Sequence, residues 1–83
     1  MNAHEWDRLT MAVVACALAN DGEGAAALLE PLDARDVSHV TVRLAAMAAE
    51  ALLLEAEAAG VGRAEVLGRW QARILDHEAR PAE

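Results

Sequence analysis

The segment from Asp33 to Ala59 constrains the fold most, because it is the longest stretch without Gly or Pro. With Val37 at heptad position a, every a and d position is apolar, a pattern typical of a helical seam rather than of a strand. These positions are Val37, Val40, Leu44, Met47, Ala51, Leu54 and Ala58. We therefore expect one long helix from about Asp33 to Ala59.

The same helix has a second apolar face, which is rich in Ala. Its b, c and f positions hold Ser38, His39, Val42, Ala45, Ala46, Ala49, Leu52, Leu53, Ala56 and Ala59. A surface helix usually has one apolar stripe and a polar back, whereas here two apolar faces are separated by two mostly polar ridges. Either the chain's other helices cover both faces, or they cover one face and a second copy covers the other.

The length of the chain favours a second copy. A chain of 83 residues buries only roughly 60–65% of its unfolded surface, so a single core is marginal. Small folds compensate with disulfides, metals, self-association or very regular helix packing. One Cys cannot form an internal disulfide, and no Cys/His cluster has zinc spacing, so we expect no metal and no cofactor. We predict a homodimer whose interface residues are Val42, Ala45, Ala49, Leu52, Leu53 and Ala56.

Composition indicates an all-α fold. Apolar residues make up 55% of the chain, with Ala the most frequent, while Phe and Tyr are absent. Such a chain cannot fill a sheet core, whereas Ala, Leu, Glu and Arg are strong helix formers. We predict a single helical domain over residues 1–83, a small bundle of four helices in which the second is short and the long third is central.

Capping residues mark the start of the first helix. Asn2 followed by Glu5 predicts a capping box, and the helix is expected to run to about Asn20. Its apolar side includes Trp6, Leu9, Val13 and Cys16.

Glycine, proline and aspartate mark the next boundaries. The turn at residues 20–24 precedes a short helix expected at about 24–30, which Pro31 ends. Asp33 is then expected to cap the long helix, with Asp36 in its first turn.

A last helix is expected at about 63–80, after the turn formed by Gly60 and Gly62. Its apolar stripe contains Leu67, Trp70 and Ile74, and residues 81–83 are expected to fray.

The stretch Leu18–Ala25, together with Leu29 and Leu32, resembles the turn and second helix of a tetratricopeptide repeat. In that family a Gly-Asp turn precedes a small residue that packs between helices, and here the small residue would be Ala25. The resemblance covers residues 18–32 without a second copy of the motif. It implies a helical hairpin that takes part in protein–protein binding rather than catalysis. The whole chain also resembles short all-helical proteins of high-GC bacteria.

The charge of the chain limits its partners. The net charge is −7, and all seven basic residues are Arg. Nucleic-acid binding needs a basic patch, and anionic membrane surfaces attract basic segments, so we expect neither partner. The longest apolar run, about Met11–Ala19, is too short to span a bilayer, and no basic region precedes it. We expect a cytoplasmic bacterial protein whose acidic ridges suit a basic protein partner.

Several residues are of types that catalyse reactions or bind metals, but their positions in the sequence disfavour such roles. Cys16 lies late in its helix, where the helix dipole does not stabilise a thiolate, so a buried apolar role is favoured. His4 with Glu5 and His77 with Glu78 would form a metal site only if the two ends of the chain met. Surface positions are the simpler interpretation.

The remaining candidates are an acidic group, two tryptophans and one histidine. Glu50 and Glu57 share one ridge while Glu55 lies on the other, which disfavours a paired-carboxylate site. Trp6 and Trp70 each lie on an apolar stripe and are interpreted as core anchors, with interface hot spots as the alternative. His39, on the second apolar face, is interpreted as an interface or rim residue.

These patterns predict a non-enzymatic interaction or regulatory protein that forms a homodimer. The alternative is a small helical protein that binds an apolar ligand between Ala-lined helices, with Met11 and Met47 as adaptable wall residues.

Overall fold

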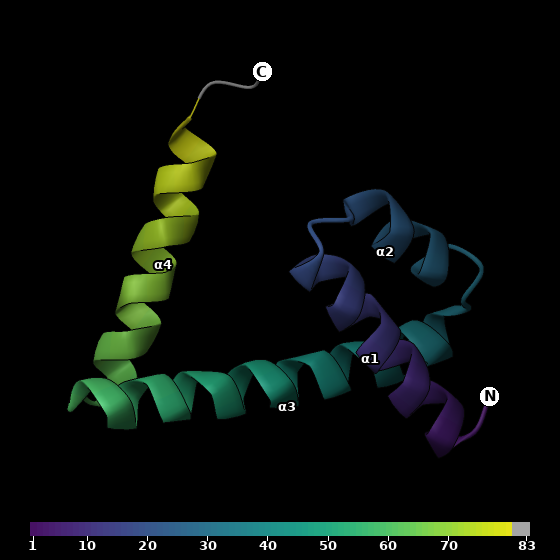
Figure 1. Ribbon diagram of the computed structural model, residues 1–83, viewed down its shortest axis with the longest axis horizontal. Coiled ribbons are helices and arrows are strands. Elements are labelled where there is room, and N and C mark those ends of the chain that lie inside the picture. Colours follow the sequence, from purple (N-terminus) through teal and green to yellow (C-terminus); the bar gives the residue numbers. More distant parts are fainter. Residues whose placement is uncertain (81–83) are drawn as a thin grey trace. The chain divides into compact units, whose positions relative to one another are not determined.

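The computed structural model describes residues 1–80 and consists of four helices (Figure 1). They are α1 (Ala3–Leu18), α2 (Gly22–Leu29), α3 (Ala34–Ala59) and α4 (Arg63–Ala79). No strand occurs among these residues. The predicted all-α fold, with a short second helix and a long third one, is confirmed. The expected fraying of 81–83 lies outside the described residues.

The chain divides into two compact units, residues 1–47 and residues 48–83. The first unit contains α1, α2 and the first part of α3, and the second contains the rest of α3 and α4. The boundary lies inside α3, so no loop or linker separates the units.

The start of α1 is fixed by the predicted capping box. The Glu5 backbone N–H donates to Asn2 Oδ1 at 2.9 Å, and the Asn2 backbone N–H donates to Glu5 Oε1 at 3.2 Å. These two bonds satisfy donors that a helix start otherwise leaves unpaired.

The turn between α1 and α2 is tighter than the sequence suggested. Asn20 adopts a positive φ of 56°, and the Asp21 N–H donates to the Cys16 carbonyl at 2.8 Å, which ends α1 at Leu18. Asp21 caps α2 by accepting from the Gly24 N–H at 2.8 Å, so both glycines belong to the first turn of the helix. The predicted start at about Gly24 was therefore wrong by two residues. A side chain at Gly24 would collide with the Asp21 carboxylate.

Both ends of α3 follow the expected chemistry. Asp33 Oδ1 accepts from the Asp36 N–H at 2.8 Å. At the other end Gly60 has a φ of +68°, and the Val61 N–H reaches back to the Ala56 carbonyl at 3.0 Å. Glycine adopts this left-handed conformation without the strain that a Cβ introduces.

The core of the first unit lies where α1 meets α3. Trp6, Thr10 and Val13 of α1 and Val40 of α3 are buried. The Thr10 hydroxyl donates to the Trp6 carbonyl at 2.7 Å, so this buried polar group is satisfied. In this part of α3 the predicted a and d seam is buried only in part: Val40 is 1% exposed, Leu44 and Met47 are half-buried, and Val37 is 39% exposed.

The second unit has a much smaller core and uses other positions of α3. Ala56 and Val66 are its buried residues within the part of the chain that the structure describes. Leu52 and Glu55 are half-buried, whereas Leu54, on the predicted seam, is 61% exposed. The seam therefore does not remain buried along the whole of α3.

Candidate functional site

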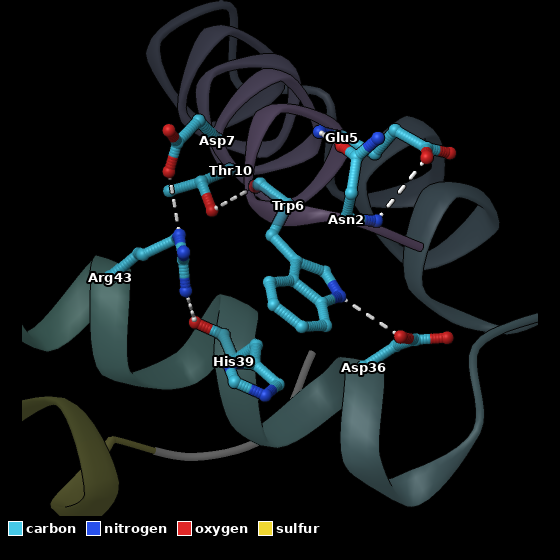
Figure 2. A network of polar contacts seen from close by, with 8 residues as sticks. All are labelled: Asn2, Glu5, Trp6, Asp7, Thr10, Asp36, His39 and Arg43. Carbon is cyan, nitrogen blue, oxygen red and sulfur yellow. Dashed lines mark hydrogen bonds and ion pairs between the residues drawn. The ribbon is translucent and has the colours of Figure 1, made fainter.

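A cluster of polar and aromatic side chains joins α1 to α3 in the first unit (Figure 2). The Trp6 indole stacks on the His39 ring, with centroids 3.5 Å apart and an angle of 9° between planes. Its Nε1–H donates to Asp36 Oδ1 at 2.9 Å. Trp6 is 8% exposed, so it anchors the core, and His39 supports it.

Arg43 completes this cluster. Its guanidinium lies 5.3 Å from the centre of the Trp6 ring, within the range of a cation–π contact. Arg43 Nε donates to Asp7 Oδ1 at 2.6 Å, and Nη1 donates to the His39 carbonyl at 3.1 Å. The Trp6 indole N–H and the Arg43 guanidinium each reach an acceptor within the cluster, which is the arrangement of a structural tie between helices.

An apolar groove in the second unit is the strongest candidate for binding. Its volume is about 430 Å³. It lies between the later part of α3 and α4, and it is lined by Ala48, Ala51, Leu52, Glu55, Leu67, Trp70 and Ile74. We call this feature the α3–α4 groove. Its size falls within the range of about 300–1,000 Å³ that is common for binding pockets.

The polar groups of the α3–α4 groove already interact with one another. The Trp70 Nε1–H donates to Glu55 Oε2 at 3.1 Å, and the Arg73 guanidinium lies 4.8 Å from the centre of the Trp70 ring. Leu67, Trp70 and Ile74 nevertheless remain 51%, 40% and 54% exposed. The groove is an apolar surface with one engaged carboxylate, which suits binding better than catalysis.

The six residues predicted to form an interface differ in their exposure. Val42 and Ala45, in the first unit, are exposed, as are Ala49 and Leu53 in the second. Leu52 is half-buried and lines the groove.

The sixth of these residues, Ala56, is only 4% exposed and is covered by its own chain. We call the two exposed positions of the second unit, Ala49 and Leu53, the α3 strip. The strip does not line the groove. Of the six predicted interface residues, Leu52 is the one that lines it.

The residues considered for chemistry are distributed over both units. His4 and His77 are exposed and belong to different units, and Cys16 is a half-buried free thiol. Among residues 1–80, no group of three or more His, Cys, Asp or Glu side chains is placed to hold a metal ion. Met11 and Met47 line a pocket of the first unit rather than the groove.

The groove was not predicted from the sequence, because the apolar stripe of α4 has the spacing of a helix that is buried in a core. The sequence predicts Leu67, Trp70 and Ile74 on the apolar stripe of a bundle helix, whereas the structure leaves these side chains about half exposed. The sequence does contain one indication of an open stripe. After residue 47 the large apolar residues of α3 are confined to residues 52–54, which are too few to cover the apolar stripe of α4.

One helix, α3, is long and apolar enough to cross a membrane by length and composition. From the sequence, only the longest uninterrupted apolar run, Met11–Ala19, was considered as a membrane span. The segment that forms α3 was not considered, because Arg43 and Glu50 interrupt the apolar residues of that helix. Only 6% of the qualifying stretch is buried. A single helix of this kind is weak evidence, since helices of water-soluble proteins also meet the criterion.

No protein-family model, curated protein or solved structure is significantly similar to this chain.

Proposed function

We propose that this protein is a non-enzymatic protein–protein interaction module that forms a homodimer through the α3–α4 groove. The observation that carries the proposal is the small core of the second unit. Only Ala56 and Val66 are buried among residues 48–80, while the large side chains lining the groove stay about half exposed. Exposed apolar patches of this kind mark interaction surfaces.

The helix pair within residues 48–83 is too small to be stable without an additional source of stabilisation. Segments below about 40 residues are rarely stable without disulfides, metals or oligomerisation. Residues 48–83 contain no Cys, and their described part presents no cluster of metal ligands. Self-association is the remaining route, because two such hairpins can pair into a four-helix arrangement that covers both grooves.

The distribution of charge favours a second copy over a basic partner at this surface. Residues 48–80 carry six acidic residues against four Arg, which leaves −2, whereas residues 1–47 carry seven against three, which leaves −4. On α4, acidic and basic side chains already pair, as in Glu65 with Arg69 at 3.3 Å and Asp76 with Arg80 at 3.1 Å. Two copies therefore meet with little net repulsion. A basic protein partner remains the alternative, and it suits the more acidic first unit.

The expected affinity is modest. Completing the burial of Leu52, Leu67, Trp70 and Ile74 contributes roughly 1 kcal/mol per side chain, or about 8 kcal/mol for two copies. Association costs about 4–15 kcal/mol in lost freedom. Because the two quantities are comparable, we expect a weak, concentration-dependent dimer.

The α3 strip is the competing interface. It offers little apolar area because Ala49 is small, whereas the groove contains Trp70, an aromatic anchor of the kind that dominates interfaces. The groove is therefore the preferred surface.

Three Leu→Gln variants distinguish the surfaces. Leu67→Gln changes the groove, Leu53→Gln changes the α3 strip, and Leu18→Gln changes an apolar side chain of the first unit that is 85% exposed. Analytical size exclusion should show a weaker dimer for Leu67→Gln and an unchanged one for Leu18→Gln. Loss of the dimer only in Leu53→Gln would move the interface to the α3 strip.

A second candidate function is the binding of a small apolar ligand in the same groove. The volume of about 430 Å³ and the nearly continuous apolar lining favour it. Displacement of an environment-sensitive dye by fatty acids, with loss of displacement in Leu67→Gln, would support the ligand. Absence of dye and fatty-acid binding at concentrations where the protein is dimeric would instead support a second copy as the occupant.

We further propose a water-exposed location in the cytoplasm, with neither a membrane nor a nucleic acid as partner. A charged residue at the centre of a bilayer costs about 2.5–3.5 kcal/mol, and α3 carries both Arg43 and Glu50. In a flotation experiment with anionic vesicles the protein should stay in the dense fraction. Flotation with the vesicles would contradict this part of the proposal.

A further inference from the structure

We infer that α4 becomes stably helical only when a second copy covers its apolar side. The inference rests on the proposed dimer and adds a mechanism to it: association and the folding of α4 are one event. A single chain would then keep a folded first unit and a largely unfolded segment after Gly62.

Helix α4 buries little of its surface within its own chain. Val66 is the one buried residue of this helix, and its other residues are exposed. By contrast, the similarly long α1 buries Trp6, Thr10 and Val13. Most helical stability in proteins comes from packing of an apolar face, and α4 lacks this packing within its own chain.

Helix α4 also lacks the side-chain cap that the other three helices have at their start. Helices α1, α2 and α3 each begin with a side chain that accepts a backbone N–H, from Asn2, Asp21 and Asp33. The corresponding residue of α4 is Gly62, which provides no side-chain cap. Gly68 lies inside the helix, where glycine is an unfavourable residue. Both features lower the stability of α4 as an isolated helix.

The buried contacts between α4 and α3 are confined to the first part of α4. The buried residues Ala56 and Val66 lie close in sequence to the turn at Gly60 and Gly62. Beyond them, the hydrogen bond from Trp70 to Glu55 lies in an exposed position, and every described residue after Trp70 is exposed. The helix is therefore held near its start and needs a partner along the rest of its length.

Hydrogen exchange tests this inference directly. Peptides covering 66–78 should exchange quickly at a protein concentration below the dimer midpoint and slowly above it, while peptides from α1 stay protected at both. Protection of 66–78 that is equally strong in the monomer would overturn the inference and leave the proposed dimer standing. A protein that is monomeric at every concentration would overturn the proposed function and this inference with it.

A glycine substitution provides a second, thermodynamic test. A Cβ at Gly68 meets no atom within 4 Å, and Gly68 does not line the groove, so Gly68→Ala raises helix propensity without changing the proposed contacts. If α4 folds on association, the substitution raises the equilibrium constant for folding α4 by a factor of about four to five in each copy. The dissociation constant of the dimer then falls by about 15- to 25-fold.

The control follows from the same reasoning. If α4 is already folded in the monomer, Gly68→Ala stabilises monomer and dimer equally and leaves the dissociation constant unchanged, which would overturn the inference. Gly22→Ala, in α2, also meets no atom within 4 Å, and it should leave the dissociation constant unchanged. Isothermal dilution calorimetry measures all three proteins.

Discussion

At the scale of single residues, the two tryptophans show how the same sequence pattern leads to different environments. Both lie on apolar stripes, and both donate the indole N–H to a carboxylate. Trp6 is 8% exposed because His39 stacks on its face, whereas Trp70 is 40% exposed. Trp6 therefore contributes to the stability of the first unit, and Trp70 is available to a partner.

Removal of the acceptor for Trp6 should destabilise the first unit. Asp36→Ala leaves the part-buried indole N–H unpaired, which costs about 1–3 kcal/mol. Asp36→Asn keeps an oxygen at the same position and should cost clearly less. Urea unfolding followed by tryptophan emission in a Trp70→Phe background measures both. Equal losses for the two variants would show that the hydrogen bond does not contribute.

At the scale of helices, substitutions at the ends of α3 are expected to change the stability of the protein. Gly60 has a φ of +68°, and Gly62 has a φ of −78° in the same turn. Gly60→Ala should cost about 1–2 kcal/mol because a Cβ disfavours the left-handed conformation. Gly62→Ala, where a Cβ meets no atom within 4 Å, should cost less. Thermal unfolding of the two variants gives the comparison, and a reversed order would contradict the turn geometry.

The cap at the other end of α3 should make stability depend on pH. The Asp36 backbone N–H donates to the Asp33 carboxylate and holds the pKa of Asp33 below its ordinary value of 3.8. The folded state therefore favours the ionised carboxylate. The resulting stabilisation is present above the ordinary pKa and is lost as pH falls through the lowered pKa of the folded state.

Asp33→Asn tests this dependence, because the amide oxygen still caps the helix but does not ionise. Its unfolding free energy should fall less than that of the unmodified protein when pH is lowered from about 5 to about 2. Glu78→Gln, on the exposed surface of α4, serves as the surface control. An identical acid dependence in Asp33→Asn and the unmodified protein would contradict the role of the cap.

Helix type and most helix ends, the start of α2 excepted, could be predicted because they depend on nearby residues. The Asn2–Glu5 box, the Asp33 cap and the Gly60 turn each involve side chains within a few positions of the backbone groups they satisfy. The buried side of α3 could not be predicted in the same way. Both of its faces are apolar, so burial depends on which helix lies against each part, as the opposite fates of Val40 and Leu54 illustrate.

At the scale of the whole molecule, the two units differ in how they complete a core. The first unit closes around Trp6, Val13 and Val40. The second leaves the α3–α4 groove open, with Trp70 in its wall. The proposed homodimer follows from this difference, because the second unit gains from a partner the burial that the first unit obtains from its own chain.

Sedimentation equilibrium of the unmodified protein tests this account most directly. The chain has a mass of 8.8 kDa. As the concentration rises from low micromolar toward millimolar, the measured mass should increase from that of one chain toward that of two, in a reversible manner. A mass that stays at one chain across the whole range would contradict the account.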